Sequence, residues 1–283
     1  NSSRSCSRNG HTNCRDVTVS WPRMVVDYTA RNDFQRLDVS VPPTTIPLTP
    51  SLFTPSFPVM PPLISELIGD IAGQVTLAGQ GRYQAGFSGR LSIDGEVERV
   101  ELAGTNINGL TLRDRVTLDQ AGEMVSEEPA TLAIERWGLG EALAIRNMRT
   151  GWEWQQGRNL AVSPINAELL GGQVDIAGFA THWPAADFST QLTATDISLE
   201  RLSEALDVPG LRMTGAIVGG VGIERQDGIV RLNDGSFTAA GGTLQYHGVA
   251  AQAAVAEQAQ LAFDVLENFE YDSLTMSLEG VIG

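Results

Sequence analysis

Apolar and polar residues alternate with a period of two along most of the chain, most clearly between residues 211 and 248. The apolar odd positions from Leu211 to Ile223 alternate with polar or small residues such as Arg212. Only an extended strand collects alternate residues on one face. Asp227-Gly228 and Asp234-Gly235 follow as turn signals, so the stretch predicts four antiparallel strands that share one apolar face.

The same alternation extends over much of the remaining chain. Residues 17–41 predict a short β segment, and strands dominate from about residue 74 to residue 195. The pairs Gly219-Gly220 and Gly241-Gly242 predict bulges or sharp bends, since glycine weakens a strand unless curvature requires it. The chain is therefore expected to be mainly β: an elongated, curved antiparallel β-sheet with an open groove and a few short amphipathic helices.

Three segments show the spacing of an amphipathic helix instead. Helices are expected near residues 63–72, 198–208 and 254–269, where apolar residues recur at intervals of three and four. Ser198 is a suitable N-cap for the second of them, which Pro209-Gly210 ends.

Proline content and the chain ends define the other segments. Residues 42–62 hold eight of the chain's 13 prolines. Proline cannot donate to the ladder of a central strand, so these residues predict a Pro-rich strap or linker. Residues 1–16 are expected to form an irregular N-terminal segment, and residues 63–283 a continuous β-groove.

The formal net charge of −15 at pH 7 limits the partners that the chain can have. Binding nucleic acid requires a basic surface that neutralises phosphates, so no nucleic-acid partner is expected. The same charge disfavours nonspecific docking on anionic lipid. No run of 18 apolar residues occurs, so nothing in the sequence predicts a membrane-spanning helix. Asn1 and Gly283 resemble cut ends, and a membrane anchor is expected upstream of the sequence.

The sequence carries no recognisable catalytic or metal-binding motif. GxSxG, HExxH and CxxC do not occur and the three histidines are scattered, so no enzyme activity, catalytic residue, cofactor or metal is expected. Cys6 and Cys14 flank His11, which falls short of the four ligands of a structural zinc site. The two cysteines form either a disulfide or two free thiols. The acidic pairs Glu127-Glu128 and Glu96/Glu98 have the chemistry of metal ligands, but they are expected on a charged outer face or turn.

The apolar face of the predicted sheet must be covered, and two architectures achieve this. A second sheet could close over it as a sandwich, or the sheet could curl into an open trough that a ligand fills. Acyl chains suit the trough, because exposing sixteen carbons to water costs about 12 kcal/mol at about 0.8 kcal/mol per methylene, or about nine decades in population. The candidates for the groove lining are Leu211, Met213, Ile217, Val221, Ile223, Phe237, Leu244, Tyr246, Leu274, Met276 and Leu278.

Three features of residues 160–280 carry a resemblance to a known family. They are the helix ISLERLSEALDVPG that leads into Gly210-Leu211-x-x-x-Gly215, the Asp-Gly and Gly-Gly hairpin signals, and the segment Asn268-Phe269-x-Tyr271-x-x-Leu274. In these features the chain resembles YdbH-type proteins of the AsmA-like superfamily, which are related to TamB and YhdP.

This resemblance implies a function that the alternation alone does not. It implies an envelope protein in the periplasm of a diderm bacterium, tethered to the inner membrane by a segment outside this chain. It would be a non-enzymatic bridge that shields phospholipid acyl chains on their way to the outer membrane, with inner- and outer-membrane partner proteins. The alternative is a periplasmic scaffold or assembly protein that binds polypeptide clients on the same apolar face.

Overall fold

A computed structural model gives the arrangement of most of the chain. It describes residues 5–9, 11–15, 27–30, 37–49, 68–83, 86–102, 104–140, 142–182, 186–246 and 269–282. These residues divide between two compact units. The first unit takes Asn1–Glu135, Arg149–Ser163 and Ala180–Trp183, and the second takes Arg136–Met148, Pro164–Phe179 and Pro184–Gly283.

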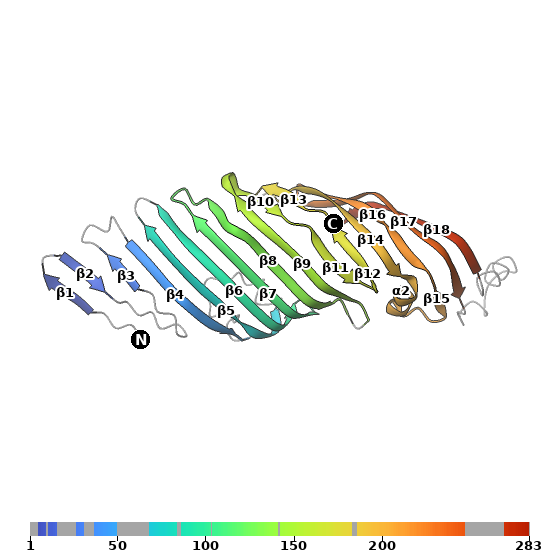
Figure 1. Cartoon of the computed structure of the whole chain (residues 1–283), viewed down its shortest axis with the longest axis horizontal. Helices are drawn as coiled ribbons and strands as arrows, with labels where there is room; N and C mark the ends of the chain where they lie inside the picture. The colour runs from blue at the N-terminus through green and yellow to red at the C-terminus, as the bar shows by residue number, and fades with distance from the viewer. Residues whose placement is uncertain are drawn as a thin grey trace. The chain divides into compact units, whose positions relative to one another are not determined.

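The first unit is an antiparallel sheet of consecutive strands (Figure 1). From β1 to β7, each strand pairs antiparallel with the next one along the chain. Strands β5 and β6 have 16 residues each, long enough for about 50 Å of extended chain at about 3.3 Å per residue. The strands that contribute to this unit are β1 (Ser5–Asn9), β2 (His11–Arg15), β3 (Asp27–Ala30), β4 (Leu37–Leu48), β5 (Ile68–Tyr83), β6 (Phe87–Leu102), β7 (Thr105–Leu118), β8 (Met124–Gly138), β9 (Ala144–Gln155), β10 (Asn159–Val162) and β13 (Phe179–His182), with the 3₁₀ turn η2 (Gln156–Arg158).

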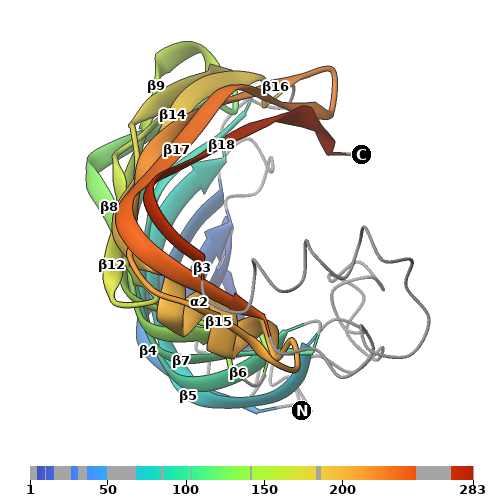
Figure 2. The same ribbon diagram turned by 90° about the vertical axis from the view of Figure 1, so that its right-hand side faces the viewer.

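The second unit is also an antiparallel sheet, which carries one helix among its described residues. Strand β17 pairs with β16 on one side and β18 on the other, and β15 pairs with the last residues of β17. Figure 2 shows that β17 and β18 bend along their length, so this sheet is curved. Besides parts of β8 and β9, the unit contains β11 (Ile165–Leu169), β12 (Gly172–Ile176), β14 (Phe188–Ser198), α2 (Leu199–Leu206), β15 (Leu211–Met213), β16 (Ala216–Gln226), β17 (Ile229–Tyr246) and β18 (Phe269–Ile282).

The open, mainly β fold that the alternation predicts is confirmed. Among the described residues, neither unit contains two sheets that pack face to face, so the sandwich alternative is wrong within each unit. Burial agrees with an open sheet, because no large side chain in the described part of the chain is less than 2% exposed. A closed core would bury several such side chains completely.

Helix α2 begins at the predicted N-cap and ends at Leu206, before Pro209-Gly210. The backbone N–H of Arg201 donates to Ser198 Oγ at 3.2 Å, which satisfies one of the free donors of the first turn. Asp207 follows the last turn in the left-handed conformation, with a φ of 47°. Leu199 lies against the sheet and is only 3% exposed.

We expect Ser198→Ala to lower the free energy of unfolding by about 1 kcal/mol, because the capping bond is lost while the packing of Leu199 stays. Urea denaturation followed by circular dichroism would measure this change. The exposed, nearby substitution Glu200→Gln is the control and should have a smaller effect; equal effects of the two substitutions would contradict a capping role for Ser198.

Two predicted helices need correction or lie outside the described residues. Residues 63–67 of the first predicted helix lie outside the described residues. Residues 68–72 are not helical but form the start of strand β5, where Ile71 pairs with Val100 of β6. A helix of ten residues is marginal by itself, and Gly69 weakens it further, whereas the strand gains a ladder. Residues 254–268 of the predicted third helix lie outside the described residues, and Phe269 begins β18.

Two predicted irregular segments contain strands. Residues 42–48 belong to β4 rather than to a strap, and a register shift between Val41 and Thr44 accommodates Pro42 and Pro43. Bulges are places where a sheet tolerates proline. Residues 50–62 lie outside the described residues. Within the predicted irregular segment 1–16, β1 and β2 form a hairpin whose register sets Cys6 opposite Cys14.

The stretch 211–248 contains three described strands rather than four. Asp227 and Gly228 form the expected turn between β16 and β17, with φ values of 52° and 80°. Asp234 also has a positive φ, of 52°, but β17 runs through it with a register shift between Leu232 and Gly235. The second turn signal therefore makes a β-bulge, which uses the same left-handed conformation without reversing the chain.

Candidate functional site

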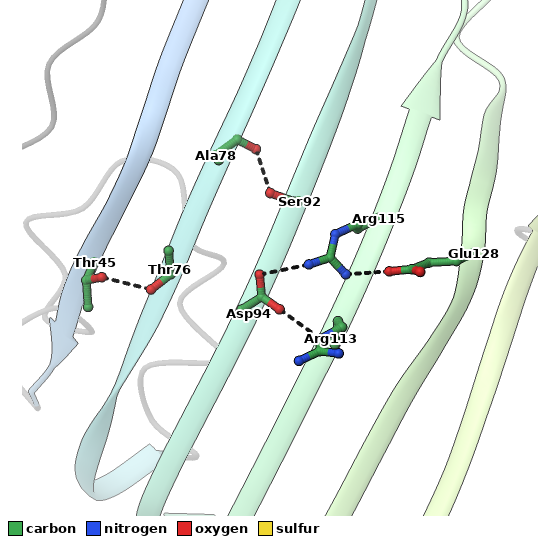
Figure 3. Close-up of polar contacts among 8 residues, drawn as sticks. All are labelled: Thr45, Thr76, Ala78, Ser92, Asp94, Arg113, Arg115 and Glu128. Atoms are coloured by element: carbon green, nitrogen blue, oxygen red, sulfur yellow. Dashed lines mark hydrogen bonds and ion pairs between the residues drawn. The ribbon is translucent and has the colours of Figure 1, made fainter.

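One face of the first unit is polar and held by ion pairs. Arg113 Nε lies 3.1 Å from Asp94 Oδ1, and Arg115 bridges Asp94 to Glu128 (Figure 3). These groups are well exposed, so each pair adds at most about 1 kcal/mol to stability. Their effect is to keep this face hydrated. The same face carries the pairs Arg90–Glu127 and Thr45–Thr76.

The acidic residues that the sequence offers as metal ligands lie in this ion-paired surface. Glu127 and Glu128 pair with Arg90 and Arg115, and Glu96 accepts a hydrogen bond from Gln74 Nε2 at 3.0 Å. Within the described residues, no three His, Cys, Asp or Glu side chains gather into a metal site. The prediction of a charged outer face is confirmed for these carboxylates.

The opposite face of the first unit is apolar and exposed. The ladder sets Leu91 of β6 opposite Gly79 of β5 and Val116 of β7, and directly opposed residues share a face. Tyr83, Phe87 and Leu91 on these strands are 43–48% exposed. No segment among the described residues covers these side chains.

This apolar face carries a groove of about 270 Å³. Gly81 makes room for the Phe87 ring beside the groove, because a Cβ at this position would overlap that ring. The volume lies below the range of about 300–1,000 Å³ for enclosed small-molecule sites, so the groove suits a chain that passes over it. Its lining is apolar or glycine except for Gln80 and Arg90, and comprises Val39, Val41, Gly79, Gln80, Gly81, Phe87, Gly89, Arg90, Leu91, Val116, Leu118 and Met124.

The sheet register of the second unit brings the predicted lining candidates onto one face. Ile217 stands opposite Ala239, which stands opposite Leu274 on β18. Phe237 likewise stands opposite Met276. On this face lie Leu211, Met213, Ile217, Val221, Ile223, Phe237, Leu244, Tyr246, Leu274, Met276 and Leu278.

These candidates differ in what covers them. Met213 and Ile217 pack against a buried cluster of Leu199, Ala239 and Tyr271, so α2 covers this part of the face. Burial raises the pKa of the Tyr271 hydroxyl. The candidates on β18 are instead open, and Leu274, Met276 and Leu278 are 38–53% exposed.

The groove of the first unit is the feature that the sequence-based candidates miss. Its residues show the same period-two alternation as those of β16 to β18, and glycines occupy Gly79, Gly81 and Gly89 on the same face. Glycines at alternate positions facing large apolar residues on neighbouring strands are the signal that could have identified it.

The described residues thus define an open antiparallel β-sheet protein with a hydrated face and an apolar face that its own side chains leave partly uncovered. The family described as the intermembrane phospholipid transport protein YdbH matches residues 21–281, and the chain belongs to this YdbH-like family. The resemblance inferred from the sequence is thereby confirmed. Transport between membranes places the family in a cell envelope.

No curated protein and no solved structure matches the chain. No helix in the described part of the chain has the length and apolarity that crossing a membrane requires.

Proposed function

We propose that the chain is a non-enzymatic segment of a lipid-transfer bridge, whose apolar sheet face shields phospholipid acyl chains. The observation that carries this proposal is the groove of about 270 Å³ on an apolar face whose reverse side is ion-paired. Membership of an intermembrane phospholipid transport family supports it.

The register offers an acyl chain a continuous apolar path across the strands. Val41, Gly79, Leu91 and Val116 are successive register partners on β4, β5, β6 and β7. Neighbouring strands lie about 4.8 Å apart, so apolar contacts recur at that interval along the path. A chain of sixteen carbons gains about 12 kcal/mol at most from full burial, and an open groove recovers part of it. Partial burial holds the chain while it still slides.

We further propose that this segment acts in the periplasm of a diderm bacterium and passes lipid toward the outer membrane. The tether to the inner membrane would belong to a part of the protein outside this chain, and partner proteins in both membranes would load and receive the lipid. Transport between two membranes, which defines the family, supports this placement.

Lipid mass spectrometry of the purified chain tests the proposal. We expect phospholipid to co-purify with the chain, and Met276→Glu/Leu278→Glu to lose most of it, because both side chains are exposed and charge there repels an acyl chain. Ser277→Glu is the matched control, since Ser277 stands opposite Ser236 on the other face of β18.

Two outcomes would contradict the proposal. One is normal phospholipid content in the folded double variant. The other is a lipid-free chain that carries bound polypeptide, which would support the scaffold alternative. Met276 and Leu278 are better test positions than Ile217, because Ile217 packs against the buried cluster and its substitution would also change stability.

A further inference from the structure

A second depression, of about 640 Å³, lies in the second unit and differs in chemistry from the apolar groove. Three arginines line it: Arg136 near the end of β8, Arg146 near the start of β9 and Arg201 in α2. They come from three separate elements, so the fold and not the local sequence brings them together. Glu168 and Glu204 also line the depression.

The three guanidinium groups have no partner in the described part of the chain. None forms an ion pair or a side-chain hydrogen bond there. The arginines of the polar face in the first unit behave differently, since Arg113 and Arg115 each reach a carboxylate. The chain has a net charge of −15, so carboxylates are abundant. A lack of carboxylates therefore does not explain why these three guanidinium groups have no partner.

Two local contacts bear on the charges of this depression. Gly171 makes room for Arg201, because a Cβ there would lie 2.7 Å from Arg201 Nη1. Asn147 Nδ2 donates to Glu168 Oε1 at 3.0 Å, which gives that carboxylate a neutral partner. The lining has three arginines and two glutamates, so its formal charges sum to one positive charge.

We infer that this depression binds a phosphate group. Each guanidinium presents a planar fork of donors that matches the oxygens of a phosphate, and such charge-assisted bonds are the strong ones. Three forks from three elements fit a tetrahedral oxyanion better than a planar carboxylate with two oxygens. The phosphate could come from a phospholipid headgroup or from solution. The lipid source rests on the proposed function, whereas the anion site itself does not.

Titration calorimetry on the full chain tests this inference with three probes at fixed ionic strength. The probes are inorganic phosphate, dihexanoylphosphatidylglycerol below its micelle concentration, and succinate. We expect both phosphate-bearing probes to bind more tightly than succinate. Arg136→Gln/Arg146→Gln/Arg201→Gln should weaken both by at least tenfold, equivalent to about 1.4 kcal/mol.

Matched variants separate a built site from the general effect of charge. Arg149→Gln/Arg212→Gln/Arg231→Gln removes three positive charges that lie outside the depression. It should change the affinity for phosphate by less than about twofold. Glu168→Gln/Glu204→Gln should tighten phosphate binding, because it removes the negative charges of the lining. Arg136→Gln/Arg146→Gln/Arg201→Gln should still bind acyl chains on the apolar face. Failure of the phosphate site and failure of the lipid bridge therefore give different results.

Each remaining outcome overturns a stated part of the inference. Tighter binding of succinate than of phosphate, no binding of phosphate, or equal losses in the two triple variants would overturn the phosphate site. Binding of inorganic phosphate without binding of the lipid would overturn the headgroup source and assign the site to free phosphate.

Discussion

Phe87→Glu/Leu91→Glu is expected to reduce acyl-chain capture in the groove of the first unit by about a hundredfold. Both side chains line the groove and are 45% and 43% exposed, so an acyl chain that lies there contacts them directly. The substitution removes two large apolar contacts and forces two carboxylates to lose water when the chain binds. A hundredfold change corresponds to about 2.7 kcal/mol. This is less than the free energy of two fully buried apolar contacts added to the cost of dehydrating two carboxylates.

Photo-crosslinking measures this capture at the level of the groove. A palmitate analogue with a diazirine in its chain would be bound to the full protein and irradiated, and the labelled peptides of β5 to β7 would be quantified by mass spectrometry. Ser88→Glu is the matched control, because Ser88 lies between Phe87 and Gly89 and stands opposite Arg82 on the other face. Undiminished labelling of the double variant, with an unchanged circular dichroism spectrum, would show that the groove does not hold acyl chains.

Local sequence determines much of this fold. The alternation from Leu211 to Ile223 predicts one strand, and this stretch is extended in β15 and β16. Ser198 predicts the start of α2. Both predictions hold because strand faces and helix caps depend on residues a few positions apart. The paired glycines at Gly219-Gly220 likewise predict the irregular register that follows them in β16.

Long-range pairing decides the features that the sequence predicts wrongly. The spacing of residues 63–72 is helical, yet Ile71 joins a ladder with Val100, 29 positions away, and the ladder outweighs the local preference. Asp234 can initiate a hairpin turn or make a bulge, and the pairing of β17 with β18 selects the bulge. The local periodicity of the sequence does not specify either of these pairing partners.

The two candidate sites differ in the same way. Apolar alternation marks the face on which the groove of the first unit lies, and only the register shows that Gly81 and Phe87 meet there. The phosphate site leaves no pattern in the sequence at all, because Arg136, Arg146 and Arg201 belong to three elements and meet only in the folded unit. Sites that depend on one strand face can be predicted from sequence, and sites that depend on several elements cannot.

Tyr271→Ala is expected to destabilise the second unit by about 3–5 kcal/mol, the usual cost of deleting a large buried aromatic side chain. Tyr271 is 8% exposed and packs with Leu199 and Ala239. Its hydroxyl donates to the backbone carbonyl of Thr214 at 2.6 Å, so it ties β18 to the segment between β15 and β16. The effect is large because few side chains of this open sheet are buried. Hydrogen exchange of β17 and β18 amides would measure it, and unchanged protection would contradict this role.

Tyr271→Phe separates the hydroxyl from the ring and yields a pH test. This variant keeps the packing and should lose about 1 kcal/mol for the missing hydrogen bond. Burial raises the pKa of the Tyr271 hydroxyl, so the folded state favours the neutral form. The resulting stability is fully present below the ordinary pKa of about 10 and is lost as the pH rises through the higher folded-state pKa. The free energy of unfolding of the wild type should therefore fall more steeply than that of Tyr271→Phe above pH 10, because the other tyrosines titrate in both proteins. Parallel curves for the two proteins would show that the raised pKa does not contribute to stability.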